Sequence, residues 1–232
     1  MFFCVALPQE AMSKSKLPLV GIFGGTFDPI HYGHLRVAEE IIEAISLQKM
    51  YFIPAGVPPL RHTPIASPQH RAEIVRIAIQ DNSRFVLDER EINRGGISYS
   101  IDSLYELKQE LGKKIILCFV IGVDAFIKLD EWNNWHELFN LCHFIIAARP
   151  GHVLTSNHDV LPKELKNECS RRWVSSVDSL RNTTSGLIFV VPTTMLDISA
   201  TVIRARIAAG KSVRYLIPDA ALNHIAASQL YI

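Results

Sequence analysis

Residues 21–34 read Gly-Ile-Phe-Gly-Gly-Thr-Phe-Asp-Pro-Ile-His-Tyr-Gly-His, and this stretch decides the fold. The apolar run Leu19–Phe23 predicts a buried strand, and an amphipathic helix is expected from about Gly33. A strand that turns through glycines into a helix N-terminus binds anions, because backbone N–H groups and the helix dipole favour negative charge there. His31 and His34 add two imidazoles to this corner. The simplest ligand is a polyphosphate.

Each part of this stretch also has an ordinary structural explanation. Paired glycines often follow a strand, and a single histidine near a helix start is usually a cap or a surface residue. The joint pattern Gly-x-Phe-Asp-Pro-x-His-x-Gly-His is more specific than either part. It is neither the Gly-x-x-x-x-Gly-Lys-Ser/Thr of a P-loop nor the Gly-x-Gly-x-x-Gly of a dinucleotide-binding turn.

The stretch resembles the signature of the nucleotidyltransferase superfamily, in which such a turn grips the phosphates of a nucleoside triphosphate. A second signature of that family, Ile-Ser-Ser-Thr-x-Ile-Arg, is matched by Ile198–Arg204, with Ala200 in place of the middle serine. Two motifs in the right order are stronger evidence than one. The resemblance implies an α/β fold of the nucleotidyltransferase type, a doubly wound, Rossmann-like parallel sheet.

The spacing of apolar runs independently favours a parallel sheet covered by helices, because strand-like and helix-like segments alternate. Strands are expected at 19–23, 50–53, 84–88, 114–121, 144–148 and 187–191. Helices are expected from about 33, over 67–80 and 100–111, from 199 to about 210, and from 219, with Ser67, Ser199 and Asp219 as caps. Residues 151–186 are weakly periodic and are interpreted as an insertion or a long connection.

The composition is that of a packed enzyme of 232 residues, with 48% hydrophobic and 20% charged residues. The net charge of +1, with both signs interspersed, argues against a nucleic-acid partner. Residues 1–16 are expected to be a loose extension and 17–232 a single domain. The apolar patch at residues 1–7 is too short for a signal peptide or a membrane span. A cytoplasmic protein without a membrane partner is expected, and its oligomeric state is not predicted.

The four cysteines are scattered through the chain and form no Cys-x-x-Cys pair. Zinc ligation and thioredoxin-like chemistry are therefore disfavoured. Cys118 and Cys142 lie in or beside apolar runs and are interpreted as small buried hydrophobic residues. All four thiols are expected to be reduced.

From about Leu19 to its end the chain resembles one family in particular, the bacterial nicotinate-nucleotide adenylyltransferases. The segment Ile53–Arg61 resembles that family's Ile-Pro-x-x-x-Pro-Pro-His-Lys/Arg loop, which places Arg61 where it could contact the mononucleotide phosphate. Leu60 departs from the family's histidine. A solvated loop charge remains the alternative for Arg61.

Three further features match the acceptor site of this family. Ser98-Tyr99-Ser100 resembles its Ser-Tyr-Thr, in which the hydroxyl and nearby backbone recognise the pyridine carboxylate. Gly122-x-Asp124 matches a Gly-x-Asp that could hold a ribose, and Trp132 falls where the family has a tryptophan that stacks on the pyridine ring. The alternatives are ordinary helix caps for the serine and the aspartate, and a half-buried surface anchor for Trp132. Trp135 is assigned to packing.

The resemblance implies transfer of the adenylyl group of ATP to nicotinate mononucleotide, with Mg²⁺ brought in by the ATP and no dedicated protein ligands for the metal. The catalytic assignment is His31, His34 and Arg204. The residues assigned to ATP are Gly24, Gly25, Thr26, Phe27, His31, His34, Gly122, Asp124, Arg149, Ile198, Ser199, Thr201 and Arg204. Those assigned to the mononucleotide are Thr26, Arg61, Ser98, Tyr99, Ser100 and Trp132.

Two rival functions remain open at this point. One is an adenylyl- or cytidylyltransferase with another phosphate acceptor, such as phosphopantetheine, because the acceptor residues are individually weak signals. The other is a nucleotide-binding regulator that has lost the reaction. The presence of His31, His34 and Arg204 together argues against the regulator.

Overall fold

A computed structural model describes residues 17–60, 63–148, 160–194 and 196–232. Its centre is a seven-stranded sheet in the order β3-β2-β1-β4-β5-β7-β6, and every neighbouring pair is parallel. The strands are β1 (Leu19–Gly25), β2 (Lys49–Pro54), β3 (Phe85–Leu87), β4 (Ile116–Gly122), β5 (His143–Ala148), β6 (Trp173–Val174) and β7 (Ile188–Pro192). The predicted doubly wound parallel sheet is confirmed.

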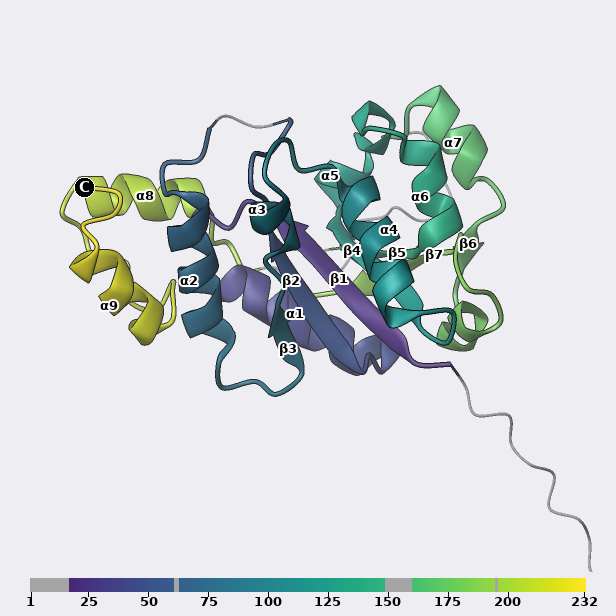
Figure 1. Cartoon of the computed structure of the whole chain (residues 1–232), viewed down its shortest axis with the longest axis horizontal. Coiled ribbons are helices and arrows are strands. Elements are labelled where there is room, and N and C mark those ends of the chain that lie inside the picture. The colour runs from purple at the N-terminus through teal and green to yellow at the C-terminus, as the bar shows by residue number, and fades with distance from the viewer. Residues whose placement is uncertain (1–16, 61–62, 149–159, 195) are drawn as a thin grey trace, which may run out of the picture.

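Helices cover both faces of this sheet, and in Figure 1 α4 lies in front of it and α1 behind it. One core is shared by the sheet with α1 (Tyr32–Ile45), α2 (Pro68–Ile79), α8 (Ala200–Ala208) and α9 (Asp219–Ala227). The opposite core is shared with α4 (Ser100–Leu111), α5 (Val123–Phe126), α6 (Trp135–Leu141) and α7 (Lys163–Cys169). The remaining elements are α3 (Arg90–Arg94), η1 (Leu129–Glu131) and η3 (Val177–Arg181).

The central strand β4 is buried on both faces of the sheet, which explains its continuously apolar sequence. Ile116, Cys118 and Val120 belong to the core on the α1 side. Leu117, Phe119 and Ile121 belong to the core on the α4 side. Because side chains alternate along a strand, a strand buried on both faces needs apolar residues at every position.

Two of the three predicted helix caps are confirmed. The Ser67 hydroxyl accepts a hydrogen bond from the His70 N–H, and the Ser199 hydroxyl accepts one from the Val202 N–H, both at 3.2 Å. The predicted cap at Asp219 is wrong, because Pro218 occupies the N-cap position and Asp219 is the first residue of α9. The aspartate still lies in the first turn, where the helix dipole favours a negative charge.

The interpretation of residues 151–186 as an insertion is corrected for the part that the structure describes. Residues 160–186 contain α7, β6 and η3, and β6 adds an edge strand beside β7. A strand of two residues is too short to produce a periodic signal, and α7 spans only two turns. The expectations for residues 1–16 lie outside the described residues.

Three of the four cysteines lie within the described chain. Cys118 and Cys142 are free and buried, as predicted, and Cys169 is also free and buried. Burial raises the pKa of the Cys118 and Cys169 thiols to about 12. These thiols are therefore protonated and unreactive at neutral pH.

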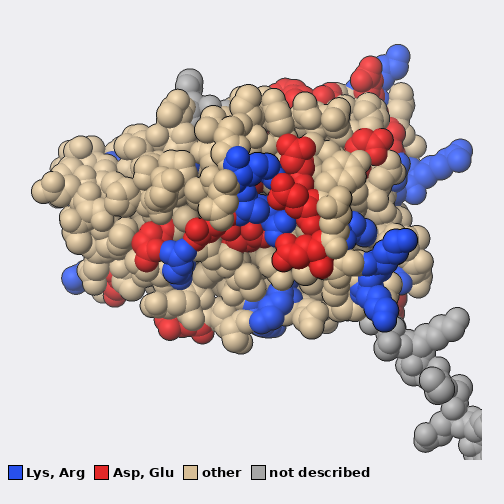
Figure 2. Space-filling model, in the orientation of Figure 1, with Lys and Arg blue, Asp and Glu red and all other residues tan. Residues whose placement is uncertain are grey.

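The surface carries both signs of charge side by side. Figure 2 shows acidic and basic side chains interspersed on the visible face, without a continuous basic stripe there. Ion pairs of this kind link α3 to α4, where Arg94 lies 2.7 Å from Glu106 and Arg90 lies 2.8 Å from Glu110. Among the helices in the described ranges, none is long and apolar enough to cross a membrane.

A fully buried arginine on α2 ties three loops together. The Arg71 guanidinium donates to the carbonyls of Thr26 at 2.6 Å, Gly56 at 3.0 Å and Ala66 at 3.2 Å. These carbonyls belong to the turn after β1, the segment after β2 and the segment before α2. Buried carbonyl groups need donors, and one planar guanidinium supplies three of them in fixed geometry.

We expect Arg71→Leu to lower the free energy of unfolding by roughly 3 kcal/mol, because it leaves buried carbonyls without a donor. Chemical denaturation monitored by circular dichroism measures this change. Arg76→Leu is the matched control, since Arg76 lies on the same helix with a half-exposed side chain and pairs only with surface carboxylates. A loss of stability in Arg71→Leu no larger than that in Arg76→Leu would contradict the proposed tie.

Candidate active site

The two central strands separate at their carboxyl ends. Backbone pairing between β1 and β4 runs from Leu19 with Ile116 to Ile22 with Phe119, although the strands continue to Gly25 and Gly122. Beyond this point each strand remains paired on its other side, β1 with β2 as far as Gly25 and β4 with β5 as far as Gly122. A crevice at the carboxyl edge, where the strand order reverses, is the usual ligand site of doubly wound folds.

The turn that follows β1 is tightly folded against this crevice. A Cβ atom on Gly25 would lie 2.9 Å from the Phe27 ring, so only glycine fits there without a shift. Phe27 itself has a φ of 47°, a left-handed conformation that a bulky residue adopts only when its surroundings hold it. Its ring is buried and lies edge-to-face with His34, with 5.2 Å between the ring centroids. The predicted glycine turn therefore orients a histidine.

His31 and His34 lie together at the start of α1. Their rings stack with centroids 3.8 Å apart. The main-chain N–H of His31 donates a hydrogen bond to Nδ1 of the His34 ring at 3.3 Å. With Nδ1 accepting this bond, Nε2 is the ring nitrogen of His34 left to donate. Burial lowers the pKa of His31 to about 4, so His31 is neutral at physiological pH. His31 can therefore form hydrogen bonds without placing a charge in a buried position.

The second sequence motif meets the first at this point. Arg204 of α8 donates from Nη1 to the main-chain carbonyl of Asp28 at 2.7 Å. A Cβ atom on Gly33 of α1 would lie 3.8 Å from the Ile198 carbonyl, which immediately precedes the Ser199 cap. Two helix N-termini, those of α1 and α8, are therefore adjacent. Thr201, on the first turn of α8, is exposed.

The carboxyl end of β4 contributes the predicted Gly122 and Asp124. Gly122 ends the strand, and Asp124 lies exposed in the first turn of α5. A Cβ atom on Gly122 would meet no heavy atom of the described chain within 4 Å. No described residue therefore fills the space beside Gly122, which leaves room for a ligand there.

Trp132 contacts the ring of Phe119 on β4, and that ring lies beside Gly24 near the end of β1. The two rings are edge-to-face with centroids 5.9 Å apart, and Trp132 is half-buried at the end of η1. The tip of the Phe119 ring would lie 3.9 Å from a Cβ atom on Gly24 of β1. An aromatic chain therefore leads from the end of β1 to Trp132. Trp135, which was assigned to packing, is buried as expected.

The three residues Ser98, Tyr99 and Ser100 lie at and before the start of α4 but differ in their surroundings. Ser98 is buried, and its hydroxyl accepts a hydrogen bond from the Gly56 N–H at 2.8 Å. Tyr99 is the N-cap residue of α4 and packs against the core on the α4 side. Ser100 is the first helical residue and is partly exposed. Ser98 thus holds the segment after β2, while Ser100 lies at a helix N-terminus.

Two predicted residues, Arg61 and Arg149, lie outside the described residues. Two others were not singled out from the sequence although the site is built on them. The carboxylate of Asp28, a residue only 5% exposed, accepts three hydrogen bonds, two from backbone N–H groups and one from a tyrosine hydroxyl. Arg71 is fully buried. Arg71 stands four residues before Val75 on the buried stripe of α2. A charged residue on an apolar helix stripe is a signal that could have revealed it.

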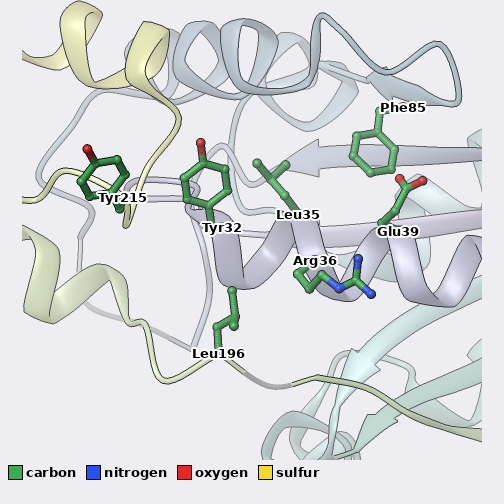
Figure 3. A pocket seen from close by; sticks show the side chains of 7 residues that line it. All are labelled: Tyr32, Leu35, Arg36, Glu39, Phe85, Leu196 and Tyr215. Carbon is green, nitrogen blue, oxygen red and sulfur yellow. The ribbon is translucent and has the colours of Figure 1, made fainter.

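A second hollow, of 390 Å³, runs along α1 and is open to solvent (Figure 3). It is lined by Tyr32, Leu35, Arg36, Glu39, Phe85, Leu196 and Tyr215. None of these residues was assigned to ATP or to the mononucleotide. Contacts join the turn after β1 to both histidines and to Arg204, and Gly122 and Asp124 follow at the end of β4, so we take the crevice between β1 and β4 as the candidate site.

The chain is similar to curated proteins along nearly its whole length. Curated relatives named "Probable nicotinate-nucleotide adenylyltransferase" include one from Halorhodospira halophila, 43% identical over 94% of this chain and 97% of its own. Another from Marinobacter nauticus is 42% identical over 90% of this chain and 95% of its own. These relatives match over nearly their whole length.

Solved structures and a family model agree on the fold. The nicotinic acid mononucleotide adenylyltransferase of Plasmodium falciparum, complexed with NaAD, superposes with a TM-score of 0.66 at 18% identity, covering 92% of this chain and 97% of that one. The cytidylyltransferase-like family model matches residues 22–206, which include both motifs. The chain therefore belongs to the cytidylyltransferase-like family and, within it, to the bacterial nicotinate-nucleotide adenylyltransferases.

Proposed function

We propose that this protein transfers the adenylyl group of ATP to nicotinate mononucleotide, releasing pyrophosphate and forming deamido-NAD for NAD biosynthesis. The names of its relatives support this reaction. The observation that carries it is the bond from Arg204 to the Asp28 carbonyl, since it brings both phosphate-binding motifs to one crevice. Two helix N-termini and a guanidinium there suit a triphosphate.

The chemistry needs no protein nucleophile. A phosphate oxygen of the mononucleotide attacks the α-phosphorus of ATP in line with the leaving group. The new oxygen–phosphorus bond forms as the bond between the α-phosphorus and the bridging oxygen breaks, and pyrophosphate leaves with that electron pair. The attacking phosphate is already anionic at neutral pH, so no general base is required. Catalysis then consists of positioning and charge stabilisation.

Each part of the phosphate corner has a role in this reaction. His34 donates to the α-phosphate oxygens as charge develops in the transition state. His31, neutral because of its lowered pKa, donates to the triphosphate without adding a charge to a buried position. Thr201 and the backbone after Ser199 hold the β- and γ-phosphates, and Arg204 stabilises the departing pyrophosphate.

Further contacts to ATP come from the edges of the crevice. Asp124, exposed after β4, accepts hydrogen bonds from the ribose hydroxyls, as carboxylates do at this point of other nucleotide folds. Gly122 lets the nucleotide approach the strand end closely. The glycines and backbone from Gly24 to Phe27 line the phosphates, and Ile198 and Arg149 complete the assigned set.

The acceptor is recognised on the α4 side of the crevice. Trp132 supplies a flat platform for the pyridine ring, and Ser100 at the N-terminus of α4 favours its carboxylate. Ser98 acts by holding the Gly56 segment in place, with Tyr99 packed behind it. Thr26 and Arg61 are proposed to contact the mononucleotide phosphate.

Mg²⁺ enters this site with ATP. Among the residues that the structure describes, no three His, Cys, Asp or Glu side chains come together as a metal site. Phosphate oxygens and water would therefore supply most of the ligands, as is common for Mg²⁺ with nucleotides. When bound, the ion neutralises charge on the triphosphate. We further propose that residues 17–232 act as a single domain and that the enzyme works in the cytoplasm.

The reaction is tested by measuring pyrophosphate release from Mg²⁺ and ATP with three separate acceptors: nicotinate mononucleotide, nicotinamide mononucleotide and phosphopantetheine. The proposed function requires strong release with the nicotinate compound and formation of deamido-NAD. Strong release with phosphopantetheine alone would assign the protein to another acceptor. Nucleotide binding without release for any of the three would favour a regulator.

His34→Ala should lower kcat by roughly 100- to 1000-fold, because it removes a preorganised donor to the transition state. Steady-state turnover measures the loss, and thermal unfolding checks that the protein stays folded. His136→Ala is the control, since His136 is exposed and stacks on Trp135. Retention of more than about a tenth of wild-type turnover by a folded His34→Ala would contradict the phosphate role.

Trp132→Ala should raise the KM for nicotinate mononucleotide much more than the KM for ATP, because stacking of aromatic rings contributes about 1 kcal/mol or more. Trp132→Phe keeps an aromatic platform and should recover most of the affinity. Both constants are measured by varying one substrate at a saturating level of the other. Equal increases in the two constants would mean that Trp132 only supports the fold.

A further inference from the structure

The Asp28 carboxylate is surrounded by donors that come from distant parts of the chain. Oδ2 accepts from the Ile65 N–H at 2.9 Å. Oδ1 accepts from the Ala66 N–H at 3.2 Å and from the Tyr231 hydroxyl at 2.8 Å. A carboxylate offers about four lone-pair positions, so three donors nearly saturate it.

Arg204 faces this carboxylate without forming a close ion pair. Its Nη1 lies 3.8 Å from Asp28 Oδ2 but donates to the Asp28 main-chain carbonyl at 2.7 Å. A bidentate arginine–carboxylate pair would require donor–acceptor distances near 2.8 Å. The guanidinium is partly exposed, with 24% of its side chain accessible. Arg204 is thus oriented by a backbone carbonyl and kept at a distance from the nearest negative charge.

Tyr231 is placed to maintain that distance. It follows α9 near the end of the sequence, is only 6% exposed, and has a φ of 66°. A left-handed tyrosine is strained, so its surroundings must hold it there. Burial and the adjacent Asp28 carboxylate raise the pKa of Tyr231, so the hydroxyl keeps its proton and donates.

We propose that Tyr231 is a positioning residue for adenylyl transfer, which rests on the proposed function above. Its hydroxyl occupies Asp28 Oδ1 and fixes the carboxylate, so that Asp28 does not draw Arg204 into a close ion pair. Arg204 is then available to the phosphates of ATP. Without the hydroxyl, only the Ile65 and Ala66 N–H groups would hold the carboxylate, and Oδ2, 3.8 Å from Arg204, could turn toward the guanidinium. The triphosphate would then have to compete with a protein carboxylate.

Tyr231→Phe tests this, because it removes one oxygen and keeps the buried ring. We expect kcat/KM for ATP to fall about tenfold, the equivalent of one hydrogen bond to a charged group, while the KM for nicotinate mononucleotide stays within about twofold. Tyr215→Phe is the control, since Tyr215 is 79% exposed and lines the hollow along α1 (Figure 3). An unchanged kcat/KM for ATP, or a KM for nicotinate mononucleotide that rises as much as the KM for ATP, would overturn the proposal.

A double-mutant cycle with Arg204→Gln separates this role from general support of the fold. If Tyr231 acts through Arg204, Tyr231→Phe should have no further effect on kcat/KM for ATP in the Arg204→Gln protein. Single-turnover conditions keep weak variants measurable. Additive losses would show that Tyr231 acts by another route. The cycle concerns ATP alone, so it can be run with whichever acceptor the wild-type protein uses, and its outcome is independent of acceptor identity.

Discussion

The three hydrogen bonds of Arg71 hold the framework on which the site depends. Its guanidinium contacts carbonyls in the turn after β1, the segment after β2 and the segment before α2. These segments all lie at the carboxyl edge of the sheet, where parallel strands end and chain direction must change. Loops at such an edge have few backbone partners of their own. The buried guanidinium of Arg71 supplies these carbonyls with donors that no neighbouring strand provides, and it holds the three segments together.

Asp28 is the second fixed point, and it joins the two sequence motifs. Its carboxylate binds residues that precede α2 and the hydroxyl of Tyr231, while its main-chain carbonyl binds Arg204. Because it is almost fully buried, its oxygens need hydrogen-bond donors from the protein, and these three supply them. The aspartate of the first motif is therefore a structural anion. Arg204, which we propose to bind the phosphates, is oriented by the main-chain carbonyl of this same residue.

The sequence predicted those parts of the site that depend on local chemistry. Glycines after a strand, histidines at a helix start and Ser199 before a helix have meaning within a few residues, and their positions are confirmed. Arg71 and the bond from Ser98 to Gly56 depend on partners far away in the chain, and no local pattern encodes such partners. The same reason explains β6, whose two residues form a strand only because β7 lies beside them.

The distribution of charge around His31, His34 and Arg204 follows from the cost of burying a charge without a partner. A buried imidazolium at His31 would require a costly desolvated charge, and burial instead keeps this ring neutral, with its pKa near 4. Positive potential comes from helix N-termini, whose dipoles need no counter-ion, and from Arg204, which the Asp28 carbonyl orients. In the proposed function, a triphosphate would replace water at these groups. These donors are then already in place, which is the condition for stabilising charge as the α-phosphorus exchanges one oxygen for another.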